Sequence, residues 1–469
     1  MAGIIPSMPD VTAADPLADL EVAVRNVVAH YLVDEQVPGI SLAITGVERT
    51  LISIVDGWAD LDAQRPIEPD TLFEIGSIGK VFTAEIVLQL VDEGRLALDD
   101  PVVRHVPWFV VPRYGPRITI HHLLGHTAGI TAGVDGTPEA VMQVWRLRDL
   151  RPGSAPGRRV HYSNLGYKIL GLVIEAVDGV PFAVSLQRRI LEPWGMATSE
   201  AAVTHEVRPR LAVGYEPARD DRPWSLGDAV RPGTWLTTDT ADGCTCANAD
   251  DMAAAVRALL RDEAGHTARM IVSQPVRGGE HQGYGLNTLT VDGHAFVGKG
   301  GGMIGYTAGL QWEPASGLGA VVLQNGPFGM PNALARLLVR MAAATQAGRD
   351  PRDERFEVDD GATDAADATP ASLPTVPEAT RDAVVGAYRS HDPWTTFFRI
   401  EARGDTLYLT FPFAPDGFDD EQPLVPMAHG WFRVGLDRLG PERLRFDTVI
   451  DGLARRAWLS GWDYYRVES

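Results

Sequence analysis

Cysteine is almost absent from this chain, which has only Cys244 and Cys246 in 469 residues. Thiols two positions apart are badly placed for an unstrained disulfide, and no histidine or further cysteine surrounds them in a metal-site pattern. We therefore expect two small buried thiols, with neither a disulfide framework nor a metal.

Positive charge is also scarce. The chain has 42 Lys and Arg against 62 Asp and Glu, which gives a formal net charge of −20. Nucleic acids and anionic membranes attract basic surfaces, so we expect neither as a partner.

Long apolar runs are missing as well, although 45% of the residues are hydrophobic. No run approaches the roughly 18 apolar residues of a membrane-spanning helix. The first twenty residues lack the basic start of a secretory signal, and Asp10, Asp15 and Asp19 interrupt any apolar segment there. The sequence therefore predicts a cytoplasmic protein.

A change in composition near residue 347 divides the chain. Residues 347–378 are rich in Asp, Ala, Pro and Thr and poor in large apolar residues, which is typical of a linker. Residues 379–469 alternate apolar and polar positions in short stretches, which predicts a small antiparallel barrel or sandwich. The expected strands are 384–389, 396–402, 406–411, 431–435, 444–448, 454–460 and 464–467.

Residues 1–346 combine helical and strand patterns. An amphipathic helix over 16–35 precedes two strands that form a hairpin, helices and loops dominate 96–260, and strands return over 286–324 before a closing helix. Asp292-Gly293 is a strong signal for a two-residue hairpin turn within the later strands. This order predicts an α+β fold in which helices cover a sheet.

The stretch from Phe73 to Ala84 runs from an extended segment into a helix and carries Ser77 and Lys80, three residues apart on one helical face. A neutral amine beside a hydroxyl can take its proton, and the free N–H groups at a helix start point at the atom that the serine would attack. Taken alone, a serine at this place is more often an N-cap.

Two further stretches carry polar groups that suit a site. Tyr162 lies on a loop just before an expected helix at 165–177, where a phenol can be held rigidly. Lys299-Gly300-Gly301-Gly302 ends an expected strand, and glycines there allow another backbone or a substrate to approach closely. The three histidines in 121–129 suggest a metal, but Gly125 and Gly129 oppose a long helix, so we expect a structural turn at a helix end.

The order Ser77-Ile78-Gly79-Lys80, Tyr162-Ser163-Asn164, Lys299-Gly300-Gly301 closely resembles the serine β-lactamase and penicillin-binding-protein superfamily. The likeness covers about residues 19–343 and is greatest to the class C-like branch of esterases, D-aminopeptidases and DD-peptidases. It implies an antiparallel sheet flanked by helices, an inserted helical domain, and an active site between them, without metal or cofactor. Residues 379–469 resemble the lipocalin-like barrel appended to some of these hydrolases.

The resemblance also implies roles for the motif residues. Ser77 would be the nucleophile, Lys80 its partner on the helix, and Tyr162 the phenol that relays protons to and from the serine, the leaving group and water. Whether Lys80 or Tyr162 takes the serine proton stays open. The expected substrate-binding and oxyanion-hole residues are Asn164, Lys299, Gly301 and Gly302, with the N–H groups of Ser77 and Gly302 forming the oxyanion hole.

Two features narrow the prediction. Gly300 stands where Lys-Thr-Gly members have a hydroxyl that helps to bind a substrate carboxylate, which argues against efficient β-lactamase activity. Ile75 stands where a Gly-x-Ser-x-Gly nucleophile elbow needs glycine, which excludes an α/β-hydrolase.

The leading hypothesis is a cytoplasmic serine hydrolase that cleaves a small-molecule ester, amide or peptide, such as a D-amino-acid amide, through a Ser77 acyl-enzyme. One alternative is an acyltransferase or peptide-cyclising thioesterase of secondary metabolism, and another is a non-catalytic binding protein on the same fold. The barrel carries no catalytic motif and is expected to cover or narrow the cleft. The oligomeric state stays open.

Overall fold

The computed structural model describes residues 15–133, 140–243, 245–271, 274–275, 280–356, 375–391, 393–414 and 418–467. Cys244 and residues 357–374 of the expected linker lie outside these ranges. Cys246 is buried, as predicted for a small thiol.

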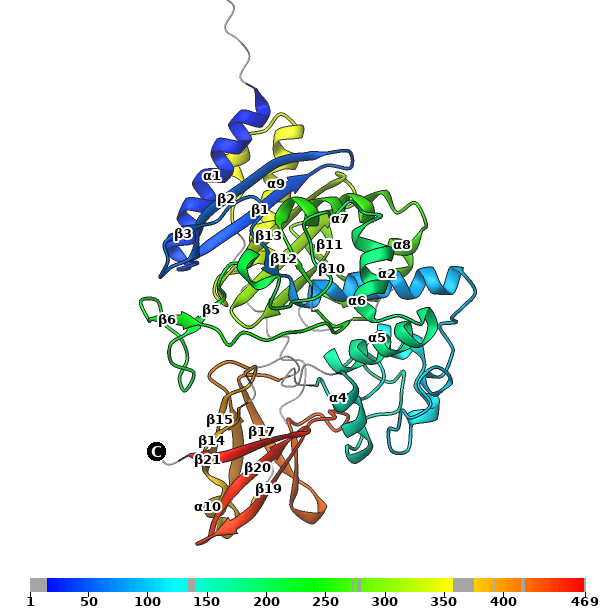
Figure 1. Ribbon diagram of the computed structural model, residues 1–469. Helices are drawn as coiled ribbons and strands as arrows, with labels where there is room; N and C mark the ends of the chain where they lie inside the picture. The colour runs from blue at the N-terminus through cyan, green and yellow to red at the C-terminus, as the bar shows by residue number, and fades with distance from the viewer. Residues whose placement is uncertain are drawn as a thin grey trace, which may run out of the picture.

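A nine-stranded antiparallel sheet forms the centre of the first unit, in the order β3-β2-β1-β13-β12-β11-β10-β9-β8 (Figure 1). Ile40 pairs with Gln324, so the first and last long strands lie side by side. The predicted turn at Asp292-Gly293 joins β10 to β11, with both residues at positive φ. The strands are β1 (Gly39–Thr45), β2 (Thr50–Asp60), β3 (Arg65–Pro66), β8 (Gln274–Pro275), β9 (His281–Gln282), β10 (Asn287–Val291), β11 (His294–Met303), β12 (Tyr306–Glu313) and β13 (Leu318–Gln324).

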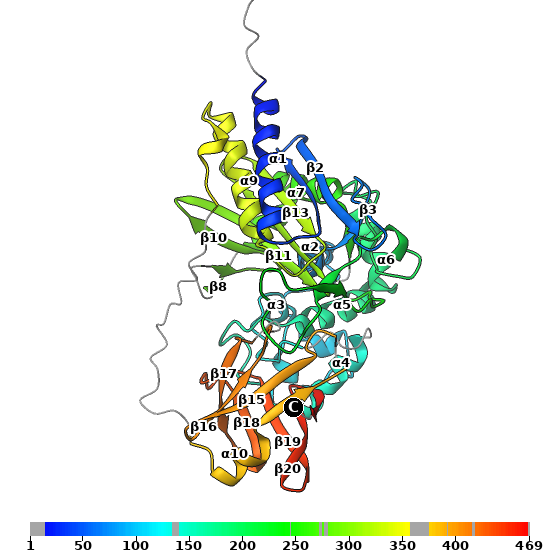
Figure 2. The same ribbon diagram turned by 90° about the vertical axis from the view of Figure 1, so that its left-hand side faces the viewer.

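Helices cover both faces of this sheet, because its long strands are apolar on both sides. Helices α1 (Pro16–Asp34) and α9 (Pro331–Gln346) pack together on one face (Figure 2). Leu42 and Val322 point into that layer, whereas their neighbours Ala43 and Val321 point into the core on the other face. Helices α2 (Gly79–Asp92) and α7 (Ala249–Arg261) belong to that second core.

A mostly helical region is inserted between α2 and α7, as the family resemblance implies. Its helices are α3 (Ile120–Leu124), α4 (Ala140–Arg146), α5 (Asn164–Asp178) and α6 (Phe182–Leu186), and α8 (His266–Met270) follows α7. The short strand β4 (Phe73–Glu74) pairs with β7 (Cys246–Ala247), and β5 (Tyr215–Pro217) pairs with β6 (Val230–Pro232).

Within the described ranges no single helix is long and apolar enough to cross a membrane. Helix α5 and the segment Phe182–Leu191 meet that requirement only as a pair, bent by 77°. Buried side chains of α5, such as Ile169 and Val173, lie in the protein core.

The C-terminal unit is a closed antiparallel barrel of eight strands, one more than the sequence predicted. The missed strand, β17, contains Pro423 and Pro426, and Leu424 is its one fully buried residue. Residues Glu378–Val384, which precede β14, form a short helix, α10. The strands are β14 (Gly386–Arg389), β15 (Phe397–Arg403), β16 (Thr406–Thr410), β17 (Glu421–Pro426), β18 (Trp431–Val434), β19 (Arg443–Ile450), β20 (Leu453–Leu459) and β21 (Trp462–Val467).

Candidate active site

Ser77 lies in a single 3₁₀ turn, Gly76–Ile78, between strand β4 and helix α2. Gly76 has φ of 53°, and a Cβ at this position would clash with the backbone of Gly302. Only glycine therefore lets the turn pass so close to strand β11. The sequence predicted Ser77 inside the first helical turn, and the structure places it just before that turn, half-buried among buried neighbours.

Lys80 is fully buried on α2 and faces Ser77. Its Nζ donates a hydrogen bond to Ser77 Oγ at 3.0 Å and another to the backbone oxygen of Asp242 at 2.5 Å. An amine at this distance can exchange a proton with the serine hydroxyl directly.

Tyr162 approaches the same hydroxyl from the helical region, with 2.6 Å between its phenol oxygen and Ser77 Oγ. The Nζ atoms of Lys80 and Lys299 lie 5.1 Å and 5.0 Å from the centre of its ring. A protonated lysine at either place would stabilise negative charge that develops on the phenol oxygen during proton transfer. The structure thus brings Ser77, Lys80, Tyr162 and Lys299 together.

Lys299 extends from strand β11, where its Nζ also donates to Asn287 Oδ1 at 3.2 Å. Strand β11 continues through the three glycines instead of ending at them. A Cβ on Gly301 would clash with the carbonyl of Ile75, so the strand lies against the turn that carries Ser77. The same contact puts Gly301 near the backbone nitrogen of Ser77, and an oxyanion hole formed by the N–H groups of Ser77 and Gly302 stays a prediction.

The space beside Gly300 is filled by a residue that the sequence did not indicate. A Cβ on Gly300 would clash with the side-chain amide of Asn332, at the start of α9. Gln311 Nε2 donates to Asn332 Oδ1 at 2.9 Å and holds that amide in place. An amide thus lies beside the position at which Lys-Thr-Gly members have a hydroxyl.

Asn164 is buried at the first residue of α5, with 7% of its surface exposed. The N-cap of this helix is Ser163, whose hydroxyl accepts from Gly166 N at 3.0 Å. The side chain of Asn164 is therefore not needed as a cap, and its predicted role toward substrate stays a prediction.

The ring of His126 packs against the ring of Tyr162, which the sequence did not predict. The structure confirms a turn after α3, because that helix ends at Leu124 and His126 has φ of 53°. The His126 ring packs 4.6 Å from the Tyr162 ring, and its Nδ1 accepts from Ser163 N at 3.0 Å. Burial, and then the charges of Lys299, Lys80 and His161, hold the pKa of His126 well below its usual value, so the ring is neutral.

Asp242 links Lys80 to a second buried lysine. Lys168 Nζ lies 3.8 Å from Asp242 Oδ2, and Thr240 Oγ1 donates to Asp242 Oδ1 at 2.6 Å. The side-chain contacts fix Asp242, and its backbone oxygen fixes Lys80.

In the part of the chain that the structure describes, no group of three or more His, Cys, Asp or Glu could hold a metal.

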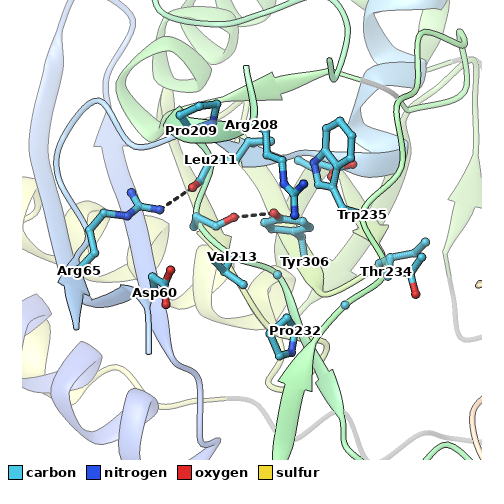
Figure 3. Close-up of a pocket in the computed structure, with 15 residues that line it drawn as sticks. Asp60, Arg65, Arg208, Pro209, Leu211, Val213, Pro232, Thr234, Trp235 and Tyr306 are labelled. Atoms are coloured by element: carbon cyan, nitrogen blue, oxygen red, sulfur yellow. Dashed lines mark hydrogen bonds between the residues drawn. The ribbon is translucent and has the colours of Figure 1, made fainter. Parts of the chain in front are cut away.

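A cavity of ~460 Å³ lies beside strand β4 and the turn between β11 and β12 (Figure 3). Strand β4 comes just before Ser77 in the chain, and the turn comes just after Gly302. Arg65 donates to the Leu211 carbonyl and Tyr306 to the Ala212 carbonyl on its wall. Glu74 also lines the cavity with 7% of its surface exposed, and burial raises the pKa of its carboxyl to about 8.

Known proteins share both sequence and fold with this chain. Residues 24–345 match the protein family described as Beta-lactamase. Protein flp of Staphylococcus aureus (strain NCTC 8325 / PS 47) is 29% identical over 238 residues, 48% of this chain and 47% of that protein. The chain therefore spans about half the length of this relative. Penicillin-binding protein 4 of Amycolatopsis lactamdurans is 28% identical over 321 residues, 62% of this chain and 82% of that protein.

Two solved structures show the same fold. The octameric penicillin-binding protein homologue from Pyrococcus abyssi is similar to this chain with a TM-score of 0.61 and 26% identity, over 94% of this chain and 99% of that one. A class C beta-lactamase mutant has a TM-score of 0.61 and 18% identity, over 70% of this chain and 99% of that one. Because the family match covers well over half of its residues, the chain belongs to the beta-lactamase family, whose members are serine hydrolases.

Proposed function

We propose that this protein is a serine hydrolase that cleaves small esters or amides through an acyl-enzyme on Ser77. The observation that carries the proposal is the position of Ser77 Oγ, 3.0 Å from Lys80 Nζ and 2.6 Å from the Tyr162 phenol oxygen. The serine proton can therefore pass to Lys80 when its amine is neutral, or to Tyr162 when its phenol is ionised.

The reaction follows from this arrangement. Ser77 Oγ bonds to the substrate carbonyl carbon while its proton passes to the Lys80–Tyr162 pair, and the carbonyl oxygen turns toward the backbone N–H groups of Ser77 and Gly302. The tetrahedral intermediate then expels the alcohol or amine, which receives the proton from the pair. Water then attacks the carbonyl carbon of the acyl-enzyme and gives a proton to the same pair. The second tetrahedral intermediate expels Ser77 Oγ, which takes that proton back, and the acid is released.

Small esters and amides that do not depend on a carboxylate for binding are the expected substrate class, with D-amino-acid amides and short peptides as the finer prediction. Lys299 offers a point charge to a substrate carboxylate, but Gly300 offers no hydroxyl beside it. A hydrogen bond to a charged group contributes about 1.5–3 kcal/mol, so we expect penicillins to acylate Ser77 more slowly than simple esters do. The cytoplasmic location also stays a prediction.

A substrate panel tests the proposal. Purified protein is incubated with p-nitrophenyl esters, D- and L-amino-acid amides and a penicillin, with Ser77→Ala as the control. We expect hydrolysis of esters or amides by the wild type and at least a thousandfold less by Ser77→Ala. Equal rates for the two proteins would refute the proposal. Addition of hydroxylamine or an alcohol then shows whether an added nucleophile replaces water, which would indicate an acyltransferase.

A further inference from the structure

The barrel places a buried carboxylate directly against the helical region of the first unit. Glu442, immediately before β19, has 4% of its surface exposed. Its Oε1 accepts from Ala132 N at 2.9 Å and contacts His161 Nε2 at 3.1 Å, and both of these residues belong to the helical region. Its Oε2 accepts from the hydroxyl of Ser460, on the barrel itself.

The two segments that Glu442 joins hold Tyr162 between them. His161 N donates to the His126 oxygen at 2.7 Å, and Leu165 N donates to the Ala132 oxygen at 3.1 Å. The residues on both sides of Tyr162 are therefore hydrogen-bonded to the segment 126–132. This segment also contains His126, whose ring packs against the Tyr162 ring. Glu442 contacts this assembly at Ala132 and at His161, next to Tyr162.

Glu442 is held as a carboxylate at this interface. Burial alone would raise its pKa, but the hydrogen bond and charge of His161, the Ser460 hydroxyl and the Ala132 N–H together lower it. Arg443, the other charged group beside it, donates to the backbone oxygen of Glu442 at 2.8 Å. The carboxylate holds its three partners in place, because moving any of them away would leave a buried negative charge with fewer hydrogen bonds, which is unfavourable.

Other contacts dock the barrel at two separate places. Near Glu442, Arg146 donates to the Gly461 oxygen at 2.9 Å, and Arg159 pairs with Asp437. Away from Tyr162, Arg389 on β14 holds Asp220 with hydrogen bonds of 2.6 Å and 3.0 Å. The second place provides a matched control, since it joins the same two units without touching the segment that carries Tyr162.

We infer that Glu442 is a positioning residue for Tyr162, through which the barrel helps to set the geometry of the active site. This inference rests on the proposed function, in which Tyr162 relays protons. The contact fixes the backbone at His161 and, through it, the place of the phenol oxygen relative to Ser77 Oγ.

A double-mutant cycle tests the inference. Glu442→Ala, Glu442→Gln and Arg389→Ala are made in the full-length wild type and in Tyr162→Phe, and the rate of fluorophosphonate labelling at Ser77 is measured by intact-protein mass spectrometry. We expect Glu442→Ala to slow labelling about 10–100-fold, because small displacements of a reacting group cost this much. Glu442→Gln keeps an acceptor for Ala132 and should recover most of the rate, and Arg389→Ala should leave it unchanged.

The Tyr162→Phe background gives the decisive result. If Glu442 acts through the phenol, Glu442→Ala has no further effect once the phenol is absent. An equal loss in both backgrounds, or an equal loss in Arg389→Ala, would overturn the inference. If Glu442→Ala does not fold, His161→Phe keeps a ring of similar shape but removes the Nε2 contact from the other side, and the same comparison applies.

Amide hydrogen exchange separates this inference from the proposed function. Exchange at residues 161–163 should quicken in Glu442→Ala and not in Arg389→Ala, whether or not Ser77 reacts with any substrate. A wild type that is never labelled at Ser77 would refute the proposed function, and unchanged exchange in Glu442→Ala would refute the positioning role.

Discussion

Removing Lys80 and Tyr162 singly and together measures whether they act as one unit. Lys80→Met keeps an unbranched side chain of similar length without the amine, and Tyr162→Phe removes only the phenol oxygen. Ser77 Oγ contacts both groups, at 3.0 Å and 2.6 Å, so either loss breaks the same proton pathway. We expect each single change to lower kcat by about a thousandfold, or ~4 kcal/mol of activation free energy.

The double variant then decides between two models. If the amine and the phenol share one proton, the double variant should lose little more than either single variant, about 10³–10⁴-fold in total. Independent roles would multiply the losses to about 10⁶-fold, or ~8 kcal/mol. A product of that size would refute the shared pathway.

The assay must separate chemistry from folding. Burst and steady-state rates with a p-nitrophenyl ester give acylation and deacylation, and denaturant unfolding gives stability. Tyr162→Phe should cost about 1 kcal/mol of stability, for one hydrogen bond. Lys80→Met should cost about 1–3 kcal/mol, because it leaves the Asp242 oxygen without the Lys80 donor. A rate loss accompanied by complete unfolding would not count toward either model, so only folded variants are compared.

Three further predictions follow from particular side chains. Burial raises the pKa of Glu74 from 4.5 to about 8, so the folded state keeps a proton that the unfolded state releases, and stability should fall as pH rises from 4.5 to 8. Glu74→Gln should remove this dependence, as denaturant unfolding at pH 5 and pH 8 would show, and an unchanged slope would contradict it. Burial opposes the charged form of His266, but hydrogen bonds to Glu85 and Asp92 outweigh it and raise its pKa. That stability is present below pH ~6.5 and is lost as pH rises through the folded pKa, so His266→Gln should destabilise the protein more at pH 6 than at pH 9. Gly300→Ala should slow labelling of Ser77 because its Cβ meets Asn332, and Gly300→Ala with Asn332→Ala should recover the rate; failure to recover would point to strain in β11 instead.

Local patterns were enough to predict much of the fold. The hairpin at Asp292-Gly293, the helix after Tyr162 and the helix after Ser77 follow from turn chemistry and from apolar spacing. Strand β17 was missed for the same reason, since Pro423 and Pro426 are unfavourable to strands and its alternation buries only Leu424 fully.

The supporting contacts of the site could not be predicted in this way. Lys80 bonds to a backbone oxygen 162 residues away, and Ala132 bonds to Glu442 across 310 residues. The sequence does not mark which backbone oxygen will accept a hydrogen bond, as that of Asp242 does. Nor does it distinguish Glu442 from the other glutamates of an acidic chain. His126 could be read from the sequence, but its contact with Tyr162 depends on the turn after α3, where His126 has φ of 53°, and on the fold that brings residues 126 and 162 together.

The most direct test of the central claim is capture of the acyl-enzyme. The protein is mixed with a p-nitrophenyl ester, quenched in acid within the burst, digested and analysed by peptide mass spectrometry. The account predicts one acyl group on the peptide that contains Ser77, present in the wild type and absent in Ser77→Ala. Turnover without any acylated peptide, or an acyl group on another residue that persists in Ser77→Ala, would contradict it.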